Sequence, residues 1–320
     1  MRARFAITPE RFGTIAKVAL FMLTVIVFTG AAVRLTGSGL GCSTWPKCES
    51  DQLYAPLETH SVIEFSNRIL TFFVSASALA AVAGAWLRVP FRRDLFRLSL
   101  LLPLGVLTQA VLGGLTVLYE LSPGWVMSHY IVSMFLLIAA FALYWKARPA
   151  KPAAPEPGER PADRQTVLVV RLLAPVALIA IAAGTAATAA GPHAGGAGTD
   201  DEVVRLTFKG ADTLKFLISS HGALVTLFGI AALGAWFLAR VRQAPKPMQD
   251  ALTALCVMLA AQGIVGGVQY ALELPAEIVW FHVTTATLTW LVVLWTWASA
   301  GSLPAKGVDA PERRREAVAA

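Results

Sequence analysis

Four of the five histidines lie near one end of long apolar segments, where they could bind a metal or another ligand. They are His60, His129, His221 and His282. A single histidine in such a segment could simply form a hydrogen bond with a neighbour. Ionisable side chains are costly in an apolar setting, however, so four at a similar depth favour a functional site. Zinc requires four ligands in a tetrahedron, which histidines on separate segments do not readily supply.

One histidine from each of two facing helices is an arrangement that suits axial ligation of haem iron. On this argument, His221 and His282 clamp one haem in the second half of the chain. His129 serves a corresponding site in the first half.

A stripe of polar residues precedes His129 in the sequence. His60, Glu64 and Asn67 are spaced to share one face of a helix, and Arg68 lies beside them. An ion pair between Glu64 and Arg68 could merely stabilise the helix. Alternatively, Glu64 acts on a substrate bound at His129, as proton acceptor or as stabiliser of developing positive charge. Arg68 would then neutralise a carboxylate of that substrate.

Two of the three cysteines lie close together in GLGCSTWPKCES. We expect a disulfide between Cys42 and Cys48, because the outer face of a plasma membrane permits one. It could be a loop staple or a redox-active pair. Cys256 is expected to be a packing residue. His193 lies in a later loop with an acidic run at 200–202, and either belongs to a solvated loop or guides a ligand.

An internal repeat relates the two halves of the chain. QAVLGGLTVLYELSPGWVMSH ends at His129, and QGIVGGVQYALELPAEIVWFH ends at His282. Each run has a glutamine, a Gly-Gly pair, a glutamate and a histidine at matching positions. The repeat predicts two related sites. The glycine pairs could allow close helix packing or make room for a flat, bulky ligand.

The composition places these residues in a membrane protein. The 320-residue chain is 56% hydrophobic and 15% charged, with a mean hydropathy of +0.61. Apolar runs long enough to cross a bilayer predict eight transmembrane helices. The first run is expected to remain as a helix rather than to be cleaved as a signal peptide. The runs cover residues 14–34, 62–87, 97–119, 124–145, 167–190, 212–239, 250–270 and 277–299.

The distribution of charge predicts the orientation in the membrane. Most of the 27 basic residues lie in the termini and in the loops on the side opposite the histidines. The positive-inside rule then places both termini in the cytoplasm of a cell whose plasma membrane holds the protein, with the site toward the outer face. The net charge of +7 therefore reflects topology, and nucleic-acid binding is not expected.

A proline-rich cytoplasmic linker at 147–166 divides the chain. It separates a four-helix bundle at 1–146 from a second bundle at 167–300, and residues 301–320 form a tail expected to be disordered. Four crossings give both halves the same orientation. The predicted fold is thus an all-α polytopic membrane protein, with two bundles related by a pseudo-two-fold axis along the membrane normal.

Several of these motifs together resemble the haem A synthase family, over about residues 14–299. They are TGSGLGCSTWPKC, IEFSNRILTF and the two repeat runs, with SSHG in the second half. The resemblance implies a pair of four-helix bundles that oxidises the C8 methyl of haem O to a formyl group, making haem A for terminal oxidases. It implies that His221 and His282 ligate a haem b cofactor, that His129 faces the substrate haem, and that Glu64 is catalytic.

The chain departs from the family pattern on the second predicted helix. The family often has a histidine three residues after the glutamate, where this chain has Asn67, and the repeat also aligns Asn67 with His221. Asparagine is a poor iron ligand. His60 could substitute, although it lies roughly 10 Å further along the helix. Otherwise the substrate haem has one axial histidine. Some relatives also carry a cysteine pair in the loop of His193, which this chain lacks.

Other functions are compatible with parts of this pattern. A non-catalytic dihaem b-type membrane cytochrome would carry electrons, but its ligands should lie near both membrane faces. A small-molecule transporter would fit the repeat, but not the clustered histidines. For a synthase, the partners expected are the bilayer, an electron-transfer partner and haem O synthase, and the chain could form a homo-oligomer.

Overall fold

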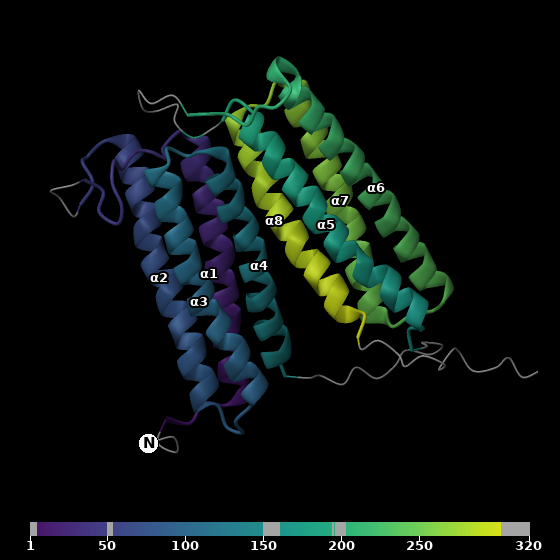
Figure 1. Ribbon diagram of the computed structural model, residues 1–320. Helices are drawn as coiled ribbons and strands as arrows, with labels where there is room; N and C mark the ends of the chain where they lie inside the picture. Colours follow the sequence, from purple (N-terminus) through teal and green to yellow (C-terminus); the bar gives the residue numbers. More distant parts are fainter. Residues whose placement is uncertain (1–4, 50–53, 150–160, 194, 196–202, 302–320) are drawn as a thin grey trace, which may run out of the picture.

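The computed structural model describes residues 5–49, 54–149, 161–193, 195 and 203–301, and this part of the chain is predominantly helical. Every long helix is apolar enough to cross a membrane. The prediction of an all-α, multi-pass membrane protein is therefore confirmed (Figure 1). The helices are α1 (Pro9–Leu35), α2 (Thr59–Leu87), α3 (Arg93–Leu118), α4 (Pro123–Ala147), α5 (Arg164–Ala190), α6 (Thr213–Val241), α7 (Lys246–Ala271) and α8 (Ala276–Ser299), with a 3-10 turn, η2 (Gly210–Asp212), before α6.

Most of the helices begin a few residues before the apolar runs that predicted them. Hydropathy detects the membrane core, whereas polar residues form the first turn. In α1, the hydroxyl of Thr8 accepts the backbone N–H of Arg11 at 3.4 Å, and Pro9 opens the helix. In α5, a carboxylate oxygen of Asp163 accepts the N–H of Thr166 at 3.1 Å. These caps satisfy backbone donors that a helix start leaves free.

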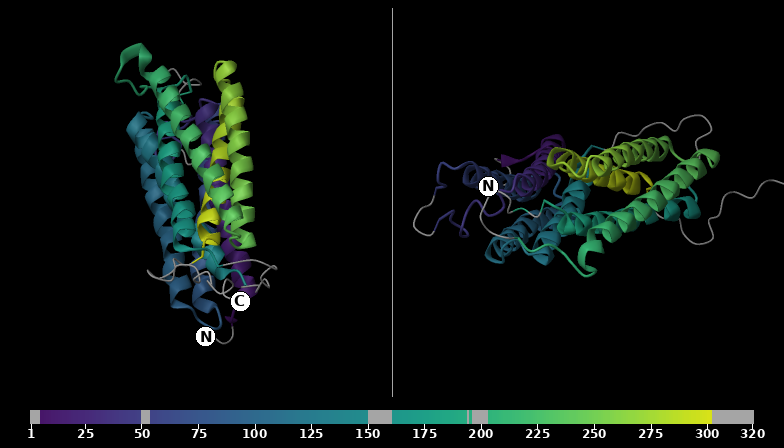
Figure 2. Two further views of the ribbon diagram at one scale, coloured as in Figure 1. Left: turned by 90° about the vertical axis from the view of Figure 1, so that its right-hand side faces the viewer. Right: turned by 90° about the horizontal axis from the view of Figure 1, so that it is seen from above.

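The helices pack as two bundles side by side (Figures 1 and 2). Helices α1–α4 contact one another in the first, and α5–α8 in the second. Between the bundles, α1 packs on α8, α4 on α5, and α4 on α8. The pseudo-two-fold relation and the division at 146 and 167 stay predictions. Residues 150–160 of the predicted linker and 302–320 of the predicted tail lie outside the described residues.

Aromatic side chains join the two bundles. The indole N–H of Trp290 donates to the carbonyl oxygen of Met134 at 3.1 Å, and the Trp290 side chain is 2% exposed. The hydroxyl groups of Tyr130 and Thr287 lie 3.4 Å apart. Since each contact joins α4 to α8, the interface has specific polar links as well as apolar packing.

The repeat is visible in the backbone of two short connections. Glu120 and Leu121 follow α3 with φ of 50° and 55°, and Glu273 and Leu274 follow α7 with φ of 61° and 64°. Residues other than glycine rarely adopt positive φ. The same unusual turn therefore recurs at matching positions of the repeat.

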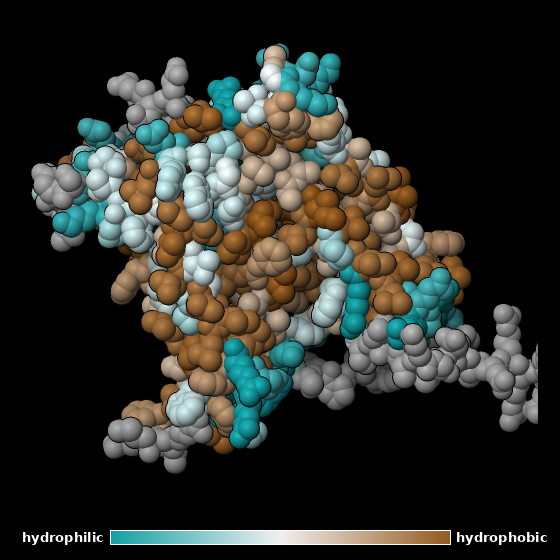
Figure 3. Space-filling model, viewed as in Figure 1, coloured by the Kyte–Doolittle hydropathy of each residue, from teal (hydrophilic) through white to brown (hydrophobic). Residues whose placement is uncertain are grey.

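The surface fits a membrane setting. Figure 3 shows hydrophobic side chains over the middle of one face, with hydrophilic side chains gathered toward its two ends. We call the end that carries the α1–α2, α3–α4, α5–α6 and α7–α8 connections the upper end, as it is drawn in Figure 1. His60, His129 and His282 lie in the first two turns of their helices at this end, and His221 lies in the third turn of α6.

Candidate functional site

A cavity of about 1220 Å³ runs between the two bundles and is lined by residues from all eight long helices. It exceeds the roughly 300–1,000 Å³ that is typical of sites for drug-sized ligands. At the upper end, loops from both halves meet. The N–H of Gly39 donates to the carbonyl oxygen of Gly195 at 3.2 Å, and Nε2 of His193 lies 2.7 Å from the carbonyl oxygen of Leu274. The cavity is therefore suited to a bulky ligand covered on its upper side.

His221 and His282 face each other in the second-half part of this cavity. Their ring centroids lie 6.4 Å apart, and the ring planes are inclined by 86°. Imidazole nitrogens lie about 2 Å from a metal that they ligate, so two rings on opposite sides of one metal atom have centroids roughly 6 Å apart. The observed separation of the centroids therefore matches the one expected for two imidazoles that ligate one metal atom.

The surroundings of the His221 and His282 rings leave one nitrogen atom of each free to bind a ligand. Nδ1 of His221 lies 3.0 Å from the carbonyl oxygen of Ala180, which favours a proton on Nδ1 and a lone pair on Nε2. Nδ1 of His282 is buried and has no hydrogen-bond partner. A buried imidazole without a partner is costly unless a ligand completes its environment.

Two glycines leave the space that these rings occupy. A Cβ at Gly184 would lie 2.9 Å from Cε1 of His221, and a Cβ at Gly266 would lie 3.3 Å from Cε1 of His282. Gly266, the first glycine of the second repeat pair, therefore makes room for the imidazole of His282. Gly267 has no atom within 4 Å of such a Cβ, so close helix packing does not explain it.

His129 occupies the matching position in the first half. Its Cε1 lies 3.5 Å from a Cβ placed on Gly113, and its buried Nδ1 has no hydrogen-bond partner. The side-chain amide of Gln109 donates to the carbonyl oxygen of His129 at 3.1 Å, and Gln262 donates to that of His282 at 3.2 Å. The repeated glutamine thus ties each histidine-bearing helix to its neighbour.

The first half lacks a second histidine in its part of the cavity wall. Asn67 lies there instead, and its Oδ1 accepts a hydrogen bond from the hydroxyl of Thr29 at 2.7 Å. His60 is not part of the cavity wall, and its Nδ1 lies 2.9 Å from the hydroxyl oxygen of Ser38. The predicted stripe on α2 is therefore divided, because its upper end meets the loop and its lower part meets the cavity.

Glu64 and Arg68 form the ion pair that the sequence allowed, and both also hold the loop after α1. One oxygen of Glu64 bonds to the guanidinium of Arg68, and the other accepts the N–H of Cys42 at 2.8 Å. Arg68 also donates to the carbonyl oxygens of Thr44 and Lys47, each at 2.8 Å. The Glu64 side chain is buried, yet both of its oxygens are satisfied and it borders the cavity.

The loop held in this way carries the expected disulfide between Cys42 and Cys48. Between them, Trp45 borders the cavity, and atoms of its indole would lie 2.9 Å from a Cβ at Gly114. The absence of a side chain at Gly114 thus leaves room for the Trp45 ring, whereas its neighbour Gly113 faces His129. The disulfide loop forms part of the wall on the first-half side.

The sequence matches a known protein family over most of its length. The family model of the cytochrome oxidase assembly protein matches residues 13–294. The chain belongs to this family. The match covers all eight helices and both histidine-bearing halves, so membership extends to the whole described cavity.

Individual family members share a shorter part of the chain. Proteins named heme A synthase are 30% identical over 122 residues in Lysinibacillus sphaericus, 28% over 126 residues in Staphylococcus epidermidis and 27% over 133 residues in Halalkalibacterium halodurans. These alignments cover 38%, 39% and 41% of this chain, and 40%, 42% and 42% of the relatives. The chain is thus aligned with about two fifths of the length of these family members.

The tertiary structure brings together most of the residues that the sequence singled out. His129, His221, His282, Glu64, Asn67 and Arg68 all border the cavity. The sequence did not point to Trp45 or to Arg34, which also border it. A signal for Arg34 existed, because it is an ionisable residue in an apolar helix with no carboxylate one turn away. In the described part of the chain, no three His, Cys, Asp or Glu side chains gather as metal ligands.

Proposed function

We propose that this protein is a haem A synthase, which oxidises the C8 methyl group of haem O to a formyl group. The observation that carries the proposal is a pair of unlike histidine sites in one cavity. Two imidazoles lie close together on one side, and a single imidazole and a paired carboxylate both line the other. Membership of the cytochrome oxidase assembly protein family and relatives named heme A synthase support it.

In this proposal, His221 and His282 hold a haem b cofactor in the second half. The ring separation of 6.4 Å and the hydrogen-bond geometry at His221 Nδ1 support this assignment. When bound, the haem supplies a redox-active iron that exchanges single electrons. The protein fixes the two imidazoles through Gly184, Gly266 and Gln262, so that little rearrangement is needed on binding.

The substrate haem lies in the first half, with His129 as its protein ligand. Asn67 is hydrogen-bonded to Thr29, and His60 is hydrogen-bonded to Ser38, which supports one axial histidine rather than two. A single ligand leaves the opposite side of the substrate iron accessible. The loop with Trp45 then forms the nearby wall and limits access of water.

Glu64 and Arg68 are proposed to act on the reacting edge of the substrate. Because both oxygens of Glu64 are already hydrogen-bonded, the carboxylate is best placed to stabilise developing positive charge. Service as a proton acceptor would first require the pair with Arg68 to open. The overall change is a four-electron oxidation that requires an external oxidant: the methyl group is hydroxylated twice, and the resulting diol loses water to leave the aldehyde.

The proposal includes a location and partners. We place the protein in the plasma membrane with both termini in the cytoplasm and the upper end toward the outer face. The first bundle handles the substrate haem and the second holds the cofactor haem. Haem O synthase is the natural supplier of substrate, an electron-transfer partner is required for the redox chemistry, and the chain could act as a homo-oligomer.

Purified protein tests the proposal through two separate readouts, the absorption spectrum of bound haem and the conversion of haem O to haem A. We expect His221→Ala and His282→Ala to lose the resident haem, and His129→Ala to keep it but lose product. His60→Ala is the matched control, because His60 lies outside the cavity wall. Normal haem A content in membranes of a strain that lacks this chain would contradict the proposal. A dihaem electron carrier would instead show haem but no product in the wild type.

A further inference from the structure

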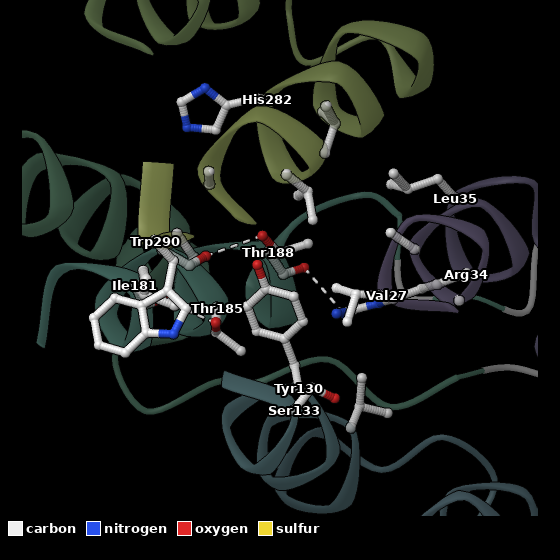
Figure 4. A pocket seen from close by; sticks show the side chains of 18 of the residues that line it. Val27, Arg34, Leu35, Tyr130, Ser133, Ile181, Thr185, Thr188, His282 and Trp290 are labelled. Carbon is white, nitrogen blue, oxygen red and sulfur yellow. Dashed lines mark hydrogen bonds between the residues drawn. The ribbon is translucent and has the colours of Figure 1, made fainter. Parts of the chain in front are cut away.

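Arg34 brings a partly buried positive charge, with a fully buried Nε, to the boundary between the two bundles. It lies in the last turn of α1, and its side chain enters the cavity beside Thr188 and Tyr130 (Figure 4). Its Nη2 donates to the carbonyl oxygen of Thr188 at a long 3.3 Å. Its Nε is buried and has no hydrogen-bond partner, and no ion pair found among the described residues includes it.

The protein groups around Arg34 do not neutralise the positive charge of its guanidinium. A guanidinium has five N–H donors, and leaving it buried without an anion costs several kcal/mol. The dipole at the end of α1 favours a cation there by only about 0.3–1 kcal/mol. The imbalance indicates that an anion binds at this point.

The charges of the cavity wall support the same conclusion. Within the described residues that line the cavity, the charged side chains are Arg34, Arg68 and Glu64. Glu64 is paired with Arg68 and with the N–H of Cys42. The wall therefore carries one uncompensated positive charge, at Arg34, and a ligand that binds here should carry a negative charge.

We propose that Arg34 binds a carboxylate of the substrate haem in the cavity, and this inference rests on the function proposed above. Haems carry two propionates on one edge, and their removal from water requires charge-assisted hydrogen bonds of the kind a guanidinium makes. The C8 methyl of haem O shares a pyrrole ring with one of these propionates. Anchoring the acidic edge at Arg34 thus restricts how the macrocycle can be turned, which makes Arg34 a positioning residue.

The position of Arg34 in the repeat makes this anchor asymmetric. Its counterpart is Thr188, 154 residues later, the spacing that also relates Asn67 to His221. The two residues contact each other across the interface. The cavity therefore has one guanidinium at this level where strict repetition would supply two.

The test compares two ligands that differ only in the carboxylates. Haem-free protein, produced under haem limitation, is titrated in detergent with ferric protoporphyrin IX or with its dimethyl ester, and binding is followed by absorption. We expect wild type to bind the diacid more tightly than the ester by roughly ten- to a hundredfold. Arg34→Gln should abolish this preference, and Arg34→Lys should restore part of it. Arg205→Gln, at an exposed arginine of the same end, should behave as wild type.

The ester also controls for folding, because an intact Arg34→Gln pocket should bind it as wild type does. Equal binding of acid and ester by wild type, or an unchanged preference in Arg34→Gln, would overturn the inference while leaving the haem site and the proposed function intact. A preference that disappears when phosphatidylglycerol replaces phosphatidylcholine in the micelles would assign Arg34 to an anionic lipid headgroup instead. Failure of wild type to bind either haem would reject both proposals.

Discussion

A Cβ placed on Gly184 would lie 2.9 Å from Cε1 of His221, closer than real side-chain contacts allow. The two residues lie on neighbouring helices of the second bundle, α5 and α6. The position of the His221 imidazole thus depends on the carbonyl of Ala180, which accepts from it, and on the absence of a side chain at Gly184. A methyl group at this point would have to displace the ring.

We therefore expect Gly184→Ala to reduce the resident haem content severalfold and to destabilise the protein by about 1–3 kcal/mol through overpacking. Haem absorption per mole of protein and thermal unfolding measure the two effects. Gly234→Ala is the matched control, because no atom lies within 4 Å of its added Cβ. Full haem occupancy in Gly184→Ala would show that the position of the ring is not set by this contact.

Gly114 and Gly267, the second glycines of the two repeat pairs, should respond differently to replacement by alanine. Gly114→Ala must displace the indole of Trp45, whereas Gly267→Ala enters open space. We expect Gly114→Ala to lower product formation and to cost about 1–3 kcal/mol. Gly267→Ala should leave the free energy of unfolding unchanged or raise it by up to about 1 kcal/mol. Parallel assays of haem A formation and thermal unfolding compare the pair, and identical behaviour of the two variants would refute the proposed role of Trp45.

The Glu64 carboxylate offers a test of catalysis apart from haem binding. Glu64→Gln retains an oxygen for the N–H of Cys42 but removes the negative charge. We expect product formation to fall roughly a hundredfold, as for the loss of a preorganised electrostatic group, while the haem spectrum is preserved. Glu49→Gln changes a carboxylate that accepts a hydrogen bond from Ser43 in the same loop, and should have no such effect. Unaltered turnover in Glu64→Gln would restrict Glu64 to a structural role.

The disulfide loop can be tested for a structural or a redox role. The double change Cys42→Ser with Cys48→Ser should cost about 2 kcal/mol, because it releases a short closed loop in the unfolded chain. We expect haem A formation to fall less than about tenfold, since Glu64 and Arg68 still hold the loop backbone. Thermal unfolding and product assays with and without a thiol reductant separate the two roles. Complete loss of product with an intact haem spectrum would instead favour a redox-active pair.

Asp163, just before α5, gives a prediction about pH. Burial alone would raise the pKa of its carboxyl, but hydrogen bonds from Thr166 and the pair with Arg242 outweigh burial and hold the pKa below its ordinary value. A lowered folded-state pKa adds stability above the unfolded value of about 3.9, and that stability is lost as pH falls through the folded value. Asp163→Asn should therefore lower the unfolding temperature at pH 7, with a difference that shrinks below about pH 4. Asp250→Asn, at an exposed pair with Lys246, should change little at either pH.

The number and type of helices could be read from the sequence, because a membrane helix is a local property of about twenty consecutive residues. The histidines on α4, α6 and α8 and the repeat could also be found, since spacing along a helix determines which residues share a face. The predicted starts were several residues late at α3 and α7, where the polar first turn carries no hydropathy signal.

The tertiary structure alone decided how these residues meet. The 6.4 Å separation of the His221 and His282 rings depends on the packing of α6 against α8 through α5 and α7. The division of the α2 stripe depends on the loop that folds over His60. The isolation of Arg34 depends on neighbours from the other bundle. Sequence spacing determines which face of a helix a residue occupies, but contacts between distant segments determine whether a charge or a ring nitrogen finds a partner.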